Sequence, residues 1–156
     1  MEALDTSLYM YYIGPYMYFL PVVKNLVRAY QAFEGYSSAH IRSLGLTPVQ
    51  FDVIATLANQ EPMTFKLLGE KTLISKSSLT GVVERMVQKA LVSCESNEED
   101  ARSQKLKLTA KGQKMFEQVF PAHLSHLKLA FDRLDQKELI QLEHSLETIT
   151  SIFNQP

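Results

Sequence analysis

Apolar residues recur at steps of three and four along most of the chain, and this spacing predicts a mainly helical protein. The first helix is predicted over residues 21–43, with Gly45 just after its end. A second helix is predicted from Pro48, with Thr47 as its cap and a polar run from Asn59 as its stop. Both have one apolar face, so both are expected to pack against other elements.

Two further helices are predicted in the middle of the chain, separated by a tight break. The shorter one covers residues 64–72, is capped by Thr64 and turns three apolar side chains inward: Phe65, Leu67 and Leu68. The longer one covers residues 76–89 and is capped by Ser75. Its apolar stripe consists of Leu79, Val82, Val83, Met86, Val87 and Ala90. The opposite face is small and polar, with Ser77, Gly81, Glu84 and Gln88 flanked by Ser78, Thr80 and Arg85.

Two short strands are predicted after these helices, at residues 91–93 and 105–108. The loop between them, residues 96–103, is too polar to lie in a core and is interpreted as the tip of a β-hairpin. Two helices joined by a tight turn and followed by such a hairpin are typical of a winged helix-turn-helix. In that fold the second helix lies in the DNA major groove and the hairpin is the wing.

Two long helices are predicted after the hairpin. Thr109 caps the first, which has an apolar stripe and which Pro121 is expected to bend or interrupt. Asp135 caps the second, whose apolar positions follow alternating steps of three and four: Leu139, Leu142, Leu146, Ile149 and Phe153. Together these stripes present more apolar surface than a small DNA-binding unit can cover. They therefore predict a homodimer built with the N-terminal helices.

The predicted fold class is mainly α with a small β wing: a winged helix-turn-helix with N- and C-terminal dimerisation helices. Residues 1–44 and 113–156 are assigned to dimerisation, and residues 45–112 to the DNA-binding unit. A chain of 156 residues can bury a core without a metal or disulfide, and no cofactor is expected.

The charge is unevenly distributed, although the formal net charge is only −1. Residues 64–114 carry ten Lys and Arg against six Asp and Glu, whereas residues 1–63 and 115–156 are both acidic. Positive charge is thus concentrated where phosphate contacts would be needed. Ordinary charge scatter is the alternative interpretation.

The N-terminal segment is rich in aromatic residues, since residues 1–20 hold five of the seven tyrosines. Residues 6–23 are uncharged, but Gly and Pro interrupt them and they fall short of the ~20 apolar residues of a spanning helix, so no membrane partner is expected. The segment is expected to pack on a partner subunit, with pocket lining or plain core as alternatives. The single Cys94 cannot form an intramolecular disulfide, which favours a reducing compartment such as the cytoplasm.

A series of short motifs runs from about Val22 to the C-terminus. It comprises Gly45-Leu46-Thr47, Gln50-Phe51, Leu67-Leu68-Gly69, residues 75–80, Glu84-Arg85-Met86, Leu91-Val92, Asp100-Ala101-Arg102 and residues 108–112. In order and spacing this series resembles the MarR (multiple antibiotic resistance regulator) family of winged-helix repressors. The most specific part is the Asp-x-Arg of the wing followed by Leu-Thr-x-x-Gly.

The resemblance implies a homodimer that binds double-stranded DNA at a pseudo-palindromic operator. It implies that Arg102 enters the minor groove and that Asp100 holds it there, which is sensible because narrow minor grooves attract Arg. A solvated loop of mixed charge is the alternative for this pair. The expected DNA contacts are Thr64, Lys66, Lys76, Ser77, Ser78, Thr80, Gly81, Arg85, Asp100, Arg102, Ser103 and Lys105.

Three residues depart from the family pattern. Gly81 stands where many relatives have a long basic side chain, and Ala101 stands where a second wing arginine is frequent. With fewer cations, phosphate attraction should be weaker and the salt dependence of binding shallower. Ala90 replaces a common glycine, so the turn into Leu91 is expected to differ.

The resemblance also implies a small-molecule effector, aromatic or phenolic, bound between the dimerisation helices and the DNA-binding unit. The residues expected to line its pocket are Tyr30, Phe33, Tyr36, His40, Phe51, Phe116 and Phe120, with plain core as the alternative.

The cysteine is the candidate for redox sensing, and the histidines are the candidates for metal sensing. Cys94 is followed by Glu95, a negative neighbour that should raise its pKa and reduce its reactivity. His123 and His126 share a helix face and His40 could lie nearby, so a zinc site is conceivable, but surface histidines are the favoured interpretation and no metal is expected.

Two other function classes are alternatives to a DNA-binding regulator. A winged-helix module used only for protein–protein contacts would suit the acidic flanks and the cations missing at Gly81 and Ala101. An enzyme is not expected, because the chain has no phosphate-binding loop, no Ser/His/Asp arrangement and no paired carboxylates in a cleft-like context. The sequence thus predicts a ligand-responsive transcriptional regulator, a repressor by family likeness.

Overall fold

The protein is represented by a computed structural model that describes residues 17–72, 74, 76–97 and 103–154. It divides into two units, residues 1–37 and 38–156. The first unit contains most of helix α2 (Leu20–Ser43), and the last turns of that helix belong to the second. Among the described helices, none is long and apolar enough to cross a membrane.

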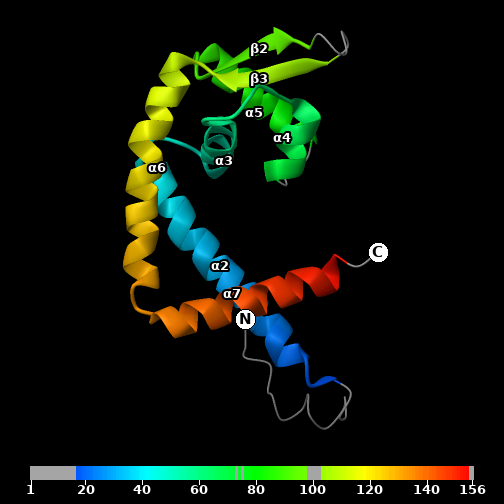
Figure 1. Cartoon of the computed structure of the whole chain (residues 1–156), viewed down its shortest axis with the longest axis vertical. Helices are drawn as coiled ribbons and strands as arrows, with labels where there is room; N and C mark the ends of the chain where they lie inside the picture. Colours follow the sequence, from blue (N-terminus) through cyan, green and yellow to red (C-terminus); the bar gives the residue numbers. More distant parts are fainter. Residues whose placement is uncertain (1–16, 73, 75, 98–102, 155–156) are drawn as a thin grey trace, which may run out of the picture. The chain divides into compact units, whose positions relative to one another are not determined.

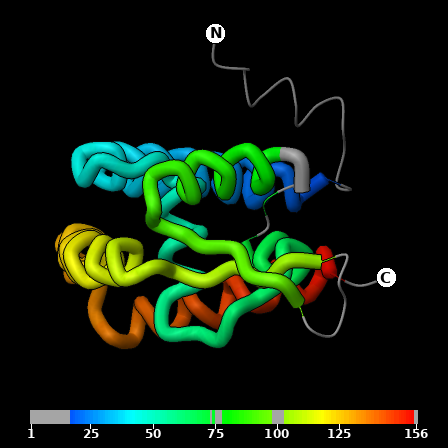
Figure 2. Tube along the Cα trace, turned by 90° about the horizontal axis from the view of Figure 1, so that it is seen from above, coloured from blue at the N-terminus to red at the C-terminus, as the bar shows by residue number. Residues whose placement is uncertain are grey.

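The second unit continues with helices and a small sheet (Figure 1). Its elements are α3 (Pro48–Leu57), β1 (Met63–Thr64), α4 (Phe65–Thr72), α5 (Lys76–Gln88), β2 (Val92–Ser96), β3 (Gln104–Leu108), α6 (Ala110–Phe131) and α7 (Gln136–Phe153). The chain passes from β3 directly into α6 (Figure 2). This order confirms the predicted fold class, mainly α with a small β wing.

The helix boundaries follow from local side-chain chemistry. Thr47 Oγ1 accepts from the Gln50 N–H at 3.2 Å, and Gln50 Oε1 accepts from the Thr47 N–H at 3.1 Å, a reciprocal cap that starts α3. Asp135 forms the same type of cap with Glu138 at the start of α7. Gly45, with φ of +83°, ends α2 as predicted. Ser75, the predicted cap of α5, lies outside the described residues.

The sheet is antiparallel with strand order β1-β3-β2. The sequence prediction missed β1, because a strand of two residues carries no alternation and exists only through its pairing of Met63 with Leu106. β2 is also longer than predicted and extends to Ser96. Cys94 therefore lies within a strand, opposite Leu106, rather than at a strand end.

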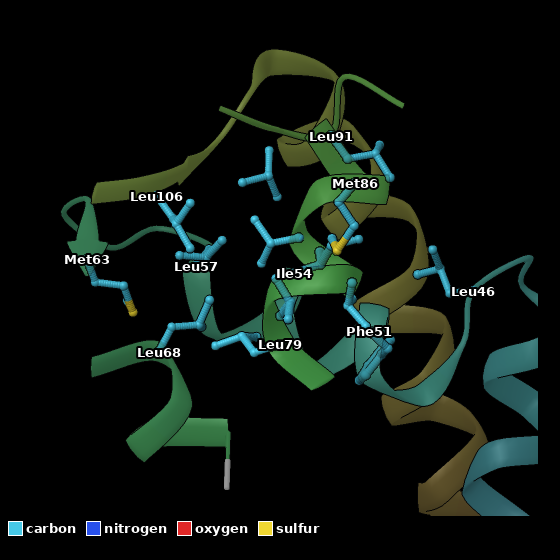
Figure 3. Close-up of a cluster of buried hydrophobic side chains, with 14 of the residues drawn as sticks. Leu46, Phe51, Ile54, Leu57, Met63, Leu68, Leu79, Met86, Leu91 and Leu106 are labelled. Carbon is cyan, nitrogen blue, oxygen red and sulfur yellow. The ribbon is translucent and has the colours of Figure 1, made fainter. Parts of the chain in front are cut away.

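The core lies between α3, α4, α5 and the sheet. Figure 3 shows Ile54, Leu57, Leu68, Leu79 and Leu106 converging there, and all five are almost fully buried. Burying a leucine or isoleucine contributes roughly 1.5–3 kcal/mol, so this cluster is a main source of the stability of the unit.

Three predicted core positions are wrong. Leu67 is 41% exposed and Val87 is 40% exposed, because Leu68 and the stripe from Leu79 to Met86 already fill the inner faces of α4 and α5. Ala90 is exposed because it lies beyond the last turn of α5 in a left-handed conformation.

The two C-terminal helices differ in how much they bury. α6 is not interrupted at Pro121, contrary to one of the predicted alternatives, because the proline lies on an exposed side where water can satisfy the freed carbonyl. α7 contains no buried residue. Its apolar face forms an open groove with Phe131, Leu139, Leu142, Glu143, Leu146, Glu147, Thr150 and Ser151 along its walls.

Candidate nucleic-acid interface

The pair α4 and α5 is held in place by its buried leucines. The Leu67 N–H donates to Thr64 Oγ1 at 3.2 Å, which starts α4 as predicted. Leu68 and Leu79, both fully buried, pack the two helices on the core. A Cβ added to Gly69 would lie 3.5 Å from the Ile74 carbonyl oxygen, so the backbone of Ile74 lies close to α4.

The exposed face of α5 carries polar side chains. Ser78, Thr80, Glu84 and Arg85 are exposed, on the side away from the buried stripe. The Arg85 guanidinium lies 3.6 Å from the position of a Cβ on Gly81. The guanidinium thus lies beside Gly81 on the helix surface, at a distance where a Cβ would make an ordinary contact with it.

The structure describes the side chains of some predicted contact residues but not of others. Lys66 is exposed on α4, Lys105 is half-buried on β3, and Thr64 and Ser103 are half-buried beside them in the chain. The side chains of Lys76 and Ser77 are not described, and Asp100 and Arg102 lie outside the described residues. All twelve assignments therefore stay predictions.

The end of α5 is fastened to the start of α6. The Leu91 N–H donates to the Met86 carbonyl at 2.9 Å and the Ala90 N–H to the Val87 carbonyl at 2.8 Å, the pattern of a Schellman turn. Thr109 Oγ1 then donates to the Ala90 carbonyl at 2.6 Å, and Lys111 Nζ to the Lys89 carbonyl at 2.8 Å. The carbonyls at the end of α5 are thus satisfied by residues of α6 and its cap.

The same junction requires a glycine. Gly112 is buried in the first turn of α6, and a Cβ placed there would lie 2.0 Å from the Leu91 carbonyl oxygen. The Gly112 N–H donates to Thr109 Oγ1 at 3.1 Å, which is the predicted cap of α6. The close approach of two backbones fixes where α6 begins.

The base of the wing is closed by a residue that the sequence prediction missed. The Asn97 N–H donates to the Ser103 carbonyl at 3.3 Å, and Asn97 Nδ2 donates to Ser103 Oγ at 2.7 Å. Asn97 is buried, so the prediction that residues 96–103 stay out of the core is wrong at this position. The sequence did not indicate this burial, because Asn97 is polar and its amide becomes buried only when both strands are in place.

One wing lysine is paired. Lys107 of β3 forms an ion pair with Glu95 of β2. Both side chains are partly exposed, so the pair adds little stability, but it reduces the positive charge that Lys107 can offer to a phosphate.

A cluster of aromatic and imidazole rings lies between the end of α2, α3 and α6. The ring centroids of Phe51 and Phe120 are 6.2 Å apart, and those of Phe51 and His123 are 4.9 Å apart in an edge-on arrangement. Phe116 stacks on Phe120 at 4.8 Å. The predicted pocket residues His40, Phe51, Phe116 and Phe120 thus belong to one cluster.

The remaining predicted pocket residues, Tyr30, Phe33 and Tyr36, belong to the first unit, where their side chains are exposed. Ligand binding between the dimerisation helices and the DNA-binding unit stays a prediction.

The interpretation that the histidines lie on the surface is wrong for His123, which is only 4% exposed. It is buried because it lies one turn after Val119 on the inner face of α6 and packs on Phe51. His40 is close to it, as the sequence suggested. In the described part of the chain, no group of three His, Cys, Asp or Glu side chains is arranged to hold a metal ion.

Cys94 is a free, exposed cysteine on β2. The pKa of its thiol is raised, as predicted, but the cause is burial of the thiol rather than the charge of Glu95. A raised pKa leaves less thiolate at neutral pH, which disfavours redox chemistry at this residue.

Comparison with known proteins agrees with this architecture. The sequence model of the MarR family matches residues 44–103. The chain is 27% identical over 124 residues to the HTH-type transcriptional regulator MhqR of Bacillus subtilis, covering 80% of this chain and 86% of that protein.

Solved structures extend the likeness to the whole fold. BpsR of Bordetella bronchiseptica, whose DNA binding is regulated by 6-hydroxynicotinic acid, is 25% identical with a TM-score of 0.74, over 83% of this chain and 98% of that one. A MarR family regulator of Streptomyces coelicolor, solved in complex with DNA, has a TM-score of 0.78 at 23% identity, over 86% and 90% of the two chains. These relatives are transcriptional regulators, which agrees with the expectation that the chain is not an enzyme.

Proposed function

We propose that this chain is a DNA-binding transcriptional regulator of the MarR family, and that it is a homodimeric repressor of the cytoplasm, released from a pseudo-palindromic operator by a small aromatic or phenolic ligand. The observation that carries the DNA-binding part is the exposed polar face of α5, on a helix whose opposite side is locked into the core by Leu79 and Met86. A rigid helix with a polar, sterically small face suits a major groove.

The proposed contacts are of two kinds. Ser78 and Thr80 on α5 are short enough to approach base edges and phosphates closely, and the Arg85 guanidinium lies beside Gly81 on the same helix. Lys66 and Lys105 would contact phosphates, and Arg102 would enter the minor groove. With Lys107 paired to Glu95, fewer cations remain for phosphates, so the salt dependence should be shallow.

The proposed dimer is supported by α7. Leu142 and Leu146 are 40% and 47% exposed in the single chain, and they lie along a groove of about 730 Å³. An exposed apolar seam of this kind is typical of a helix that packs on a second subunit.

The proposed effector is supported by the ring cluster around Phe51 and Phe120, and by BpsR, whose DNA binding responds to an aromatic acid. Flat rings stack favourably on aromatic side chains, so a small aromatic or phenolic molecule suits these walls.

DNA binding can be tested by fluorescence anisotropy with a labelled duplex from the DNA upstream of the chain's own gene, at two salt concentrations. We expect salt-sensitive binding, and a loss of at least about tenfold in Arg102→Ala, which removes one cation from the minor groove. Arg133→Ala, outside the DNA-binding unit, is the matched control and should bind like the unmodified chain.

The proposal would be wrong if no duplex bound in a salt-sensitive way, including duplexes selected from a random pool. A selected palindrome would support the dimer and its half-site spacing together.

A further inference from the structure

Three of the four histidines of the chain meet in the second unit. His40 comes from the last turns of α2, while His123 and His126 come from α6. The rings of His40 and His126 stack with centroids 4.0 Å apart and planes 5° apart, and those of His40 and His123 lie 5.3 Å apart. One imidazole from α2 is therefore in contact with two from α6.

The contact between His40 and His123 depends on protonation. Their Nδ1 atoms are 3.1 Å apart, the distance of a hydrogen bond. One Nδ1 must carry the proton and the other must offer a lone pair, so at least one of the two rings is neutral. If both rings gained a charge, two N–H groups would face each other and the contact would be repulsive.

The surroundings of the cluster act against protonation of its rings. The pKa of His40 is lowered by burial and by His126, and the pKa of His123 is lowered by burial, by His40 and by His126. From α3, the residue on the cluster is the apolar Phe51, and the pKa of the adjacent Asp52 is raised by its own burial. Burial and the neighbouring imidazoles thus favour the neutral rings of His40 and His123.

The cluster also contacts the DNA-binding unit. The His123 ring stands edge-on to Phe51, a buried residue of α3 that packs in turn on Phe120 of α6. Movement of His123 away from His40 would disturb the packing of α3 on α6. Protonation of a cluster at the end of α2 would therefore act on the helix that begins the DNA-binding unit.

We propose that His40, His123 and His126 form an acid-sensitive joint, which holds the end of α2 together with α3 and α6 at neutral pH and loosens as the cluster gains protons, so that acidification weakens DNA binding. The stabilising contact is complete above the pKa of an unfolded histidine, 6.5, and is lost as the pH falls through the lower values of the folded state. The effect on DNA affinity rests on the proposed function, whereas the joint itself does not.

The joint can be tested by NMR titration of the histidine ring protons in the full chain, together with thermal unfolding at the same pH values. We expect His40 and His123 to titrate below pH 6.5, with a melting temperature that falls over the same range. Anisotropy with the operator duplex should show an affinity lower by about tenfold or more at about pH 5.5 than at about pH 7.5.

Two variants distinguish protonation of the joint from other effects of acid on the protein. His123→Phe keeps an aromatic ring against Phe51 but cannot be charged, and His40→Gln keeps a neutral hydrogen-bonding group. Each should flatten the acid dependence of both unfolding and DNA affinity. His144→Gln, an exposed histidine on α7, is the control and should keep the full dependence.

The joint is disproved if His40 and His123 titrate at or above pH 6.5, or if both variants retain the acid dependence of the unmodified chain. Failure to bind DNA at any pH would overturn the proposed function instead, and the titration and unfolding data would still decide the joint.

Discussion

At the residue scale, the end of α5 shows how backbone conformation limits the choice of side chain. Ala90 has a φ of +56°, a left-handed conformation that a Cβ disfavours by roughly 1–2 kcal/mol. The Schellman turn nevertheless forms, and Thr109 and Lys111 bond the carbonyls of Ala90 and Lys89 within it. Ala90 thus holds the turn into Leu91 at the cost of strain, and the expected difference from the turn of the family stays a prediction.

Ala90→Gly should stabilise the protein by about 1 kcal/mol, because glycine adopts the left-handed conformation without a Cβ clash. The free energy of unfolding, measured with urea at fixed protein concentration, checks this. Ala39→Gly, at an exposed position within α2, is the matched control. It should have the opposite effect and lower the free energy of unfolding by about 1 kcal/mol. Equal effects of the two substitutions would contradict the strain at Ala90.

At the scale of elements, the start of α6 is fixed by backbone contact with the segment that follows α5. Gly112→Ala should lower the free energy of unfolding by about 3 kcal/mol, because the added Cβ would lie 2.0 Å from a carbonyl oxygen and the helix would have to shift. Urea unfolding followed by circular dichroism measures the loss.

Gly69→Ala is the control for this substitution. A Cβ there meets its nearest atom at 3.5 Å, an ordinary contact, and the helix gains intrinsic propensity. We expect no loss of stability in Gly69→Ala. A loss comparable to that of Gly112→Ala would show that any added methyl group is harmful.

The sequence predicted the helices and their caps because both depend on residues close together in the chain. The spacing of three and four and the motifs at Thr47, Thr109 and Asp135 were enough for that. It missed β1, buried Asn97 and buried His123, each of which depends on a distant partner: Leu106, Ser103 and Phe51. In the candidate site, the polar face of α5 was predictable from periodicity, whereas the position of Arg85 over Gly81 required coordinates.

At the scale of the whole molecule, α7 has no buried side chain and cannot be explained by the single chain. The double substitution Leu142→Glu and Leu146→Glu should convert the proposed dimer to a monomer, because charge in an apolar interface is costly to desolvate. Sedimentation equilibrium measures the mass directly.

Gln141→Glu adds the same type of charge to an exposed position outside the groove, so it should leave the mass unchanged. A dimeric double variant would exclude the α7 seam as the interface.

The fastening of α5 to α6 also has a mechanical consequence. α6 contains 22 residues and is therefore about 33 Å long, and its cap and first turn are bonded to Lys89 and Ala90, the two residues that follow the helix proposed to read DNA. A tilt of about 5° about one end of such a rod displaces the other end by about 3 Å. Thr109 and Lys111 thus make α6 a lever, so that a slight change where the long helix meets its surroundings would suffice to move α5 out of register with its half-site.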